Sequence, residues 1–105
     1  MGKAGSIILE RKKEMPEKSS GLDLAERLHG KKVEYAIHSA GFVQTGEGNL
    51  YKISSNSGIS FQVTNTQFSF IVEVDKVRNC RYNNGTFSFH LPGNVLISVS
   101  IERSR

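Results

Sequence analysis

The sequence predicts a single domain, mainly β, in which antiparallel strands form a small, strongly bent barrel after one short N-terminal helix. Three observations support this prediction: the length of 105 residues, apolar residues that alternate with polar ones from residue 33 onward, and turn motifs between the alternating segments. A chain of this length suits one hydrophobic core better than two. We therefore divide it into a basic leader, residues 1–20, and one β domain, residues 21–105.

The leader combines a short apolar run with clustered basic residues. The three apolar residues at 7–9 are too few to distinguish a strand from a helical turn, so both remain open. Pro16 and the Ser-Ser-Gly run that follows it are typical of a linker. Residues 1–32 hold eight Lys or Arg and five Asp or Glu, whereas residues 33–105 hold six and five. Positive charge favours an anionic partner such as nucleic acid, but the β domain itself is nearly neutral.

A two-turn helix is predicted at residues 21–29. Ser20 or Asp23 can cap its N-terminus, and Leu24 and Leu28 fall on one face. A glycine that follows can end it. A helix this short is unstable alone, so we expect its apolar face to dock on the strands.

Strict alternation of apolar and polar residues predicts the strands. The alternating segments are residues 33–38, 59–64, 68–74, 86–91 and 95–102. Between or beside them lie four turn motifs: Gly46-Glu47-Gly48, which we interpret as a hairpin, Asn56-Ser57-Gly58, Asn83-Asn84-Gly85 and Pro92-Gly93-Asn94. Short connections imply antiparallel neighbours. Because one short helix cannot cover the apolar face of a flat sheet, we expect the sheet to close on itself, although a two-sheet sandwich satisfies the same pattern.

No group of residues has the pattern of a catalytic or metal site. Cys80 is a lone cysteine and is interpreted as a small buried apolar residue. His29, His38 and His90 fall on different elements without a carboxylate or thiol at ligand spacing, which indicates surface imidazoles. We therefore predict that the protein is not an enzyme, that it binds no metal or cofactor, and that it has no small-molecule substrate. The absence of a long apolar run and of a secretory signal predicts a cytoplasmic protein with no membrane partner.

Most aromatic residues fall on the apolar faces of predicted strands, where they are expected to form the core. Tyr51 and Tyr82 differ because each adjoins a basic residue, Lys52 and Arg81 respectively. An aromatic ring next to a cation can stack on an unpaired base and contact its phosphate. We therefore regard these two tyrosines as the candidate stacking residues.

Two segments resemble the motifs of the Sm/LSm-like family. GKKVEYAIHSAGFVQTGEGNLYKISSNSGISFQV is similar to the first Sm motif, and FHLPGNVLISV is similar to the second; the likeness spans about residues 22–101. The resemblance implies a ring of identical subunits joined through edge strands. In that family an Asp, an Asn and an Arg form the RNA pocket, and these positions here fall on Ser54, Gly58 and Pro92. Gly93 and Asn94 of the second motif are retained.

Two hypotheses of function follow. The first is an Sm-like protein that forms a homo-oligomeric ring and contacts RNA weakly, with Asn56, Gly93, Asn94, Tyr51 and Lys52 as the candidate binding residues. The second is a structural or protein-interaction module, for instance from a phage or mobile element, whose exposed strands recruit another polypeptide without binding nucleic acid. The last apolar strand, residues 95–101, is expected to be an exposed edge strand that needs a pairing partner.

Overall fold

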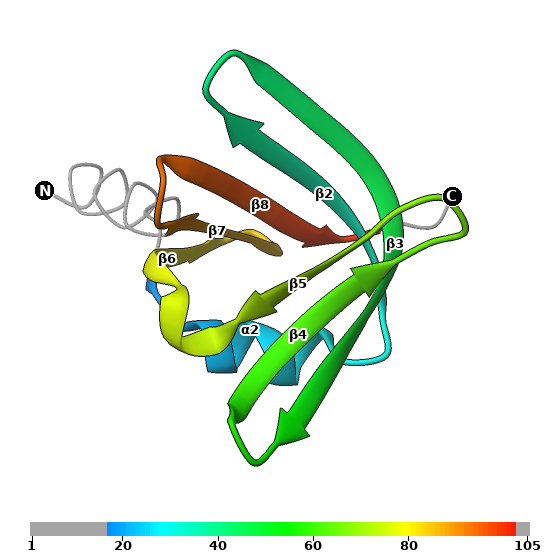
Figure 1. The fold of residues 1–105 in the computed structure, drawn as a ribbon, viewed down its shortest axis with the longest axis vertical. Helices are drawn as coiled ribbons and strands as arrows, with labels where there is room; N and C mark the ends of the chain where they lie inside the picture. Colours follow the sequence, from blue (N-terminus) through cyan, green and yellow to red (C-terminus); the bar gives the residue numbers. More distant parts are fainter. Residues whose placement is uncertain (1–16, 103–105) are drawn as a thin grey trace, which may run out of the picture.

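The computed structural model describes residues 17–102 and confirms a mainly β fold with one short α-helix (Figure 1). The elements in chain order are β1 (Glu17–Lys18), α2 (Gly21–Leu28), β2 (Lys32–Ser39), β3 (Phe42–Ser55), β4 (Gly58–Thr64), β5 (Ser69–Glu73), the 3-10 helix η1 (Val74–Lys76), β6 (Arg78–Asn83), β7 (Thr86–Leu91) and β8 (Val95–Ile101). The apolar run at residues 7–9 lies outside the described residues. Within residues 17–102, no helix has the length and apolar character needed to span a membrane.

The strands of residues 17–102 form one antiparallel sheet of eight strands, in the order β1-β6-β7-β8-β2-β3-β4-β5. The long strand β3 bends the sheet, because its first part pairs with β2 and its second part pairs with β4. The predicted curling around a shared interior is confirmed, but the predicted closure is not observed. The two ends of the sheet, β1 and β5, do not pair, and β1 is only two residues long. The expectation that residues 95–101 form an exposed edge strand was wrong, because β8 pairs with β7 and β2 inside the sheet.

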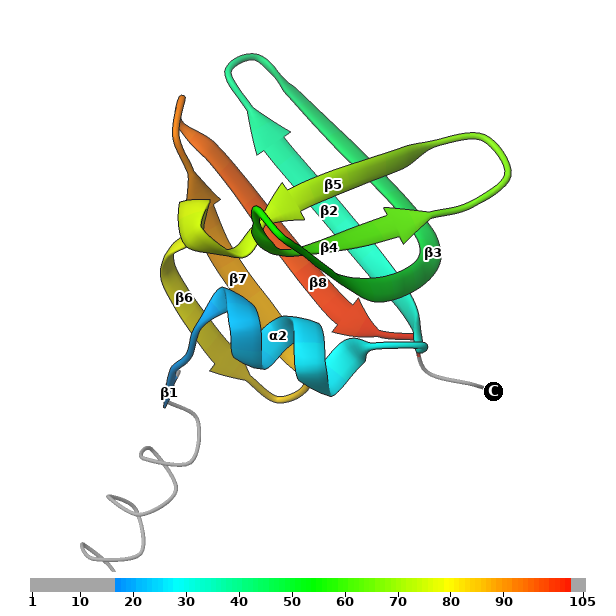
Figure 2. The same ribbon diagram turned by 60° about the horizontal axis from the view of Figure 1, so that its bottom comes forward.

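Helix α2 spans the gap that strand pairing leaves between the two halves of the sheet (Figure 2). On one side the guanidinium of Arg27 lies 4.4 Å from the ring centre of Tyr82 in β6. On the other side the Glu26 carboxylate lies 3.3 Å from the ammonium of Lys52 in β3. The helix thus joins β6 to β3 across the interior of the bent sheet.

The start of α2 agrees with the predicted cap. Ser20 is the capping residue, and its hydroxyl accepts a hydrogen bond of 3.0 Å from the Asp23 N–H. Leu24 and Leu28 are fully or almost fully buried. The helix therefore docks through the predicted apolar face, which supplies the stability that eight residues lack alone.

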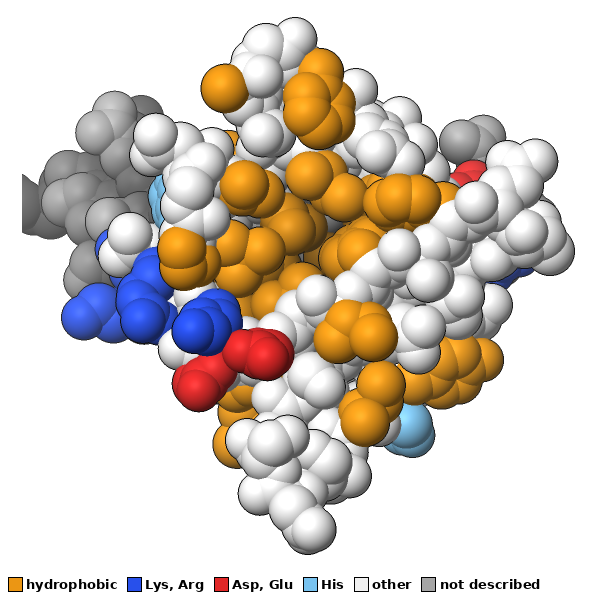
Figure 3. Space-filling model, viewed as in Figure 1, with side chains coloured by type: hydrophobic (Ala, Val, Ile, Leu, Met, Phe, Trp, Pro, Cys, Tyr) orange, Lys and Arg blue, Asp and Glu red, His pale blue; other side chains and the backbone are white. Residues whose placement is uncertain are grey.

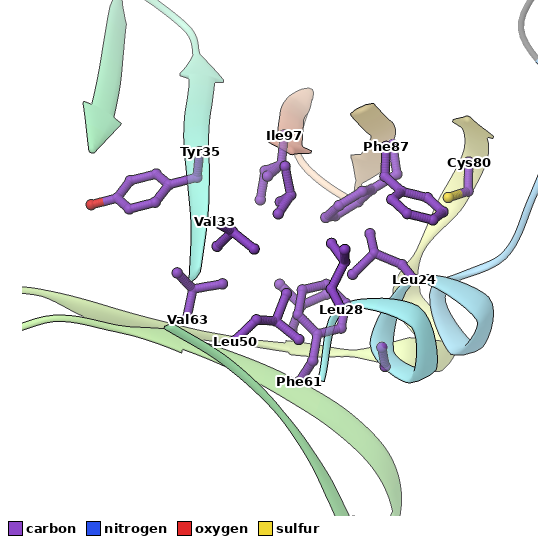
Figure 4. Packing of buried hydrophobic residues seen from close by; sticks show 14 residues of the cluster. Leu24, Leu28, Val33, Tyr35, Leu50, Phe61, Val63, Cys80, Phe87 and Ile97 are labelled. Atoms are coloured by element: carbon purple, nitrogen blue, oxygen red, sulfur yellow. The ribbon is translucent and has the colours of Figure 1, made fainter. Parts of the chain in front are cut away.

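The core consists of side chains from the inner face of the sheet and from α2. Figure 4 shows Leu24 and Leu28 projecting from the helix between Phe87 on one side and Leu50 and Phe61 on the other. Phe61 and Phe89 meet edge to face, with ring centres 5.9 Å apart. The buried apolar residues are Leu24, Ala25, Leu28, Val33, Tyr35, Leu50, Phe61, Val63, Val72, Cys80, Phe87, Phe89, Ile97 and Val99. The predicted inward positions of the alternating segments supply most of this set.

The prediction of a hairpin turn at Gly46-Glu47-Gly48 was wrong, because these residues lie inside β3. The hairpin joins β2 and β3 through Ala40-Gly41, where Gly41 has φ 86°. Gly46 and Gly48 are instead places of close approach. A Cβ on Gly46 would lie 2.5 Å from the Tyr35 hydroxyl oxygen, and a Cβ on Gly48 would lie 2.7 Å from the Thr64 carbonyl oxygen.

The three other predicted turns are confirmed. They join β3 to β4, β6 to β7, and β7 to β8. Asn84 and Gly85, at φ 51° and 84°, have the left-handed backbone that a two-residue hairpin requires.

Strands β1, β3 and β6 are not among the predicted alternating segments. In β6 the register shifts between Arg78 and Arg81, and Asn79 between them has φ 54°. This bulge interrupts the alternation on which the strand predictions depend. Glu17 and Lys18 pair with β6, so the described fold begins inside the segment that we interpreted as the leader.

Candidate functional site

The predicted RNA-contacting residues of the turns are separated in the structure. Asn56 lies in the β3–β4 turn, whereas Gly93 and Asn94 lie in the β7–β8 turn with φ of 90° and 62°. Figure 1 shows the first turn at the bottom of the molecule and the second at its left side. The fold therefore does not bring the amides of Asn56 and Asn94 together on one ligand.

Tyr51 and Lys52 lie in β3 beside the end of α2. The Lys52 N–H donates to Nδ1 of His29 at 2.9 Å, and the Lys52 ammonium pairs with Glu26. The Tyr51 ring is 43% exposed and meets the His29 ring edge to face at 6.1 Å. Tyr51 remains available for stacking, but the positive charge next to it is already paired.

Tyr82 is less available than Tyr51. Its ring packs against Phe87 with the ring centres 4.8 Å apart, and the guanidinium of Arg27 lies over it. This cation–π contact joins α2 to the sheet. The side chain that we predicted as a stacking residue thus has a structural role within the chain.

Three carboxylates converge on the outer face of the sheet, and the sequence did not predict them. Glu34 in β2 and Glu47 in β3 face each other across the two paired strands. One carboxylate oxygen from each of these residues and one from Glu102 lie within 4.8 Å of one another. The Lys32 ammonium lies 3.7 Å from the Glu102 carboxylate. Because Glu34 and Glu47 are exposed, we interpret them as a repulsive cross-strand pair rather than a metal site.

Cys80 is buried, as predicted. Burial raises the pKa of its thiol from 9.0 to about 11; a hydrogen bond with Ser19 acts in the opposite direction, and the negative charge of Asp23 adds to the rise. The thiol is therefore protonated at neutral pH and is a poor nucleophile.

An apolar hollow opens between β8 and β5 (Figure 3). Apolar side chains that pack on the core but are only partly buried include Ile37, Phe68, Phe70, Leu91 and Val95. Phe68 and Phe70 continue an aromatic cluster whose ring centres lie 5.2 to 6.1 Å apart. This hollow exists because the sheet does not close.

A cleft of about 600 Å³ adjoins the end of β5. Ile71, Val72 and Glu73 of β5 line one part of it, and Lys76, Leu91 and Pro92 complete the lining. The Ile71 side chain points to the outer face and is 60% exposed, the largest exposure among the exposed large apolar residues of the described chain. An apolar side chain of a bound protein segment would fit this environment.

Strand β5 is an edge of the sheet that no strand of residues 17–102 covers. The Asn65 N–H donates to the Phe68 carbonyl oxygen at 2.9 Å, so Asn65 and Phe68 form a hydrogen-bonded pair that continues the register of β4 and β5. Hydrogen-bonded and non-hydrogen-bonded pairs alternate along an antiparallel ladder. The N–H and C=O groups of Ser69, Ile71 and Glu73 therefore face away from β4.

Comparison of the chain with family models, curated proteins and solved structures finds no match.

The other edge of the sheet has features that discourage strand addition. Glu17 and Lys18 cover part of β6, a bulge follows Arg78, and Arg78 and Arg81 place exposed charges along it. Natural proteins protect edges with short strands, bulges and charged residues of this kind. Strand β5 lacks a bulge and a lysine or proline, so the two edges differ sharply.

Proposed function

We propose that this domain is a non-enzymatic protein-interaction module that binds an extended segment of a partner protein as an added strand on β5. The observation that carries the proposal is the bare edge, where the backbone groups of Ser69, Ile71 and Glu73 lack a strand partner within residues 17–102. Main-chain hydrogen bonds give affinity in strand addition, and alternate side chains give specificity.

The surroundings of the edge define the chemistry of the partner. On the outer face Ile71 offers an apolar contact, and on the inner face Phe70 is a partly buried apolar residue beside the core residue Val72. Because successive side chains of a strand point to opposite faces, a segment with apolar residues at successive positions suits both faces.

Charge also favours a protein partner over nucleic acid. Residues 17–102 contain eight Lys or Arg and eight Asp or Glu, so the described domain is neutral. The net charge of +4 comes from residues 1–16 and 103–105. Nucleic-acid binding depends strongly on an excess of positive charge, and the described domain has no such excess.

Amide exchange measured by NMR tests the proposal with a soluble peptide that has three consecutive valines between threonines and is flanked by lysines. We expect the peptide to slow exchange of the Ser69, Ile71 and Glu73 amides. Ile71→Pro removes an outward N–H and should abolish binding, whereas Ile71→Val should retain it. Unchanged exchange rates at saturating peptide would refute strand addition on β5.

Sm-like RNA binding is the second candidate function, and the exposed ring of Tyr51 beside His29 is the observation that favours it. It predicts salt-sensitive binding of short U-rich RNA that Tyr51→Ala weakens by about 1–3 kcal/mol. Deletion of residues 1–16 separates the contribution of these residues to RNA binding from that of Tyr51. RNA binding that disappears with this deletion and ignores Tyr51→Ala would exclude the β domain as the binding site.

A further inference from the structure

We infer that the strand that β5 receives is the β5 strand of a second copy of this chain, in an antiparallel twofold dimer centred on Ile71. This inference rests on the proposed function and names the partner. It depends on three features of residues 69–73: their pattern, their outward backbone groups and the absence of like charges in the resulting register.

The pattern of β5 is the same in both directions from its centre. Ser69-Phe70-Ile71-Val72-Glu73 has apolar residues on each side of Ile71 and polar residues at each end. In an antiparallel pair centred on Ile71, Ile71 faces its own copy. Phe70 then faces Val72, and Ser69 faces Glu73, twice each by symmetry.

This register satisfies the backbone as well as the side chains. Because the outward groups belong to Ser69, Ile71 and Glu73, hydrogen-bonded pairs between copies form only where outward residues face each other. Centring on Ile71 makes all five residues overlap, whereas a shift of either copy by two residues shortens the overlap. A shift by one residue would place outer-face residues opposite inner-face ones.

The facing side chains are complementary. The exposed Ile71 side chains cover each other on the outer face. Phe70 of each copy meets Val72 of the other on the inner face. Each Glu73 carboxylate can accept a hydrogen bond from the Ser69 hydroxyl of the other copy, and no two like charges are opposed.

The dimer is expected to be weak, because a five-residue strand pair buries less than the roughly 1,200–2,000 Å² of stable complexes. Sedimentation of the full chain over a range of about 10 µM to 1 mM therefore tests it. Ile71→Lys places two ammonium groups on the twofold axis and should raise the dissociation constant by about tenfold or more. The matched control is Ile101→Lys, at another exposed isoleucine four strands away in the sheet order, which should leave it unchanged.

Cysteine crosslinking in a Cys80→Ser background tests the register. Ile71→Cys should form a covalent dimer on oxidation, because paired residues lie about 5.5 Å apart between Cα atoms, within the range of disulfides. Ser69→Cys alone should not, since its two copies lie about 14 Å apart along the strands. A mixture of Ser69→Cys and Glu73→Cys chains should crosslink to each other.

The outcomes separate this inference from the proposed function. A protein that stays monomeric at 1 mM and still shows peptide protection of β5 overturns the second copy as the partner and leaves strand addition standing. A dimer that Ile71→Lys does not weaken, or that crosslinks through Ser69→Cys alone, also overturns the inference. Failure of both dimerisation and peptide binding refutes the proposed function as well.

Discussion

Substitution of Gly48 by alanine tests whether β3 and β4 approach as closely as the structure places them. The Cβ of alanine would lie 2.7 Å from the carbonyl oxygen of Thr64 and 3.1 Å from its carbonyl carbon. Both atoms belong to the backbone of a paired strand, so the strands must move apart. Overpacking of this kind costs about 1–3 kcal/mol.

The sign of the effect makes this prediction informative. An ordinary Gly→Ala change inside a strand stabilises a protein by about 0.5–1 kcal/mol, because glycine loses more conformational entropy on folding. We expect Gly48→Ala to lower the free energy of unfolding by about 1 kcal/mol in total, the difference between the middle of the overpacking range and the middle of this gain. For a domain of this size, that lowers Tm by about 4–8 °C.

Thermal and urea unfolding, followed by circular dichroism, measure this loss. Gly46→Ala provides the matched comparison, because its Cβ would meet the Tyr35 side chain rather than backbone. In a double-mutant cycle, Tyr35→Leu should therefore reduce the loss of stability caused by Gly46→Ala and should not reduce the loss caused by Gly48→Ala. A Gly48→Ala protein as stable as the parent, or more stable, would refute the close approach.

Three further predictions concern the rest of the domain. Glu47→Lys should raise the free energy of unfolding by about 0.5–1 kcal/mol at low salt, because it turns the repulsion with Glu34 into attraction, and high salt should reduce the gain. Ser20→Ala should cost about 1 kcal/mol in urea unfolding by removing the helix cap, whereas Ser20→Asp should be nearly neutral. The raised pKa of Cys80, about 11, means that the folded thiol keeps a proton that the unfolded thiol loses near pH 9. Stability should therefore fall between pH 9 and 11, and Cys80→Val should remove this part of the fall.

The alternation of apolar and polar residues correctly predicted strands that have one buried face and one exposed face. Val33 and Tyr35 in β2 and Phe87 and Phe89 in β7 are buried as their positions indicated. The outward position of Ile71 also follows from the sequence, since it alternates with inner residues. What the sequence could not supply was that β5 ends the sheet and leaves Ile71 at an unpaired edge.

The missed features share a physical cause, which is contact between residues that are distant in the chain. Gly48 resembled a turn residue because the reason for its small size is Thr64, sixteen positions away. Glu34 and Glu47 meet only through the β2–β3 register. The separation of Asn56 from Asn94 likewise follows from the path of the sheet. Short sequence motifs do not contain this information.

The two edges also decide between the forms of assembly. A ring requires two different surfaces that join head to tail, here β5 of one copy and the β6 edge of the next. Glu17 and Lys18 already pair with part of β6, and the bulge at Asn79 and the charge of Arg78 disfavour strand addition on the rest. An edge that pairs with its own copy closes after two chains. A native mass of two chains therefore supports pairing through β5, whereas five or more would mean that the β6 edge is used and that its protection is not effective.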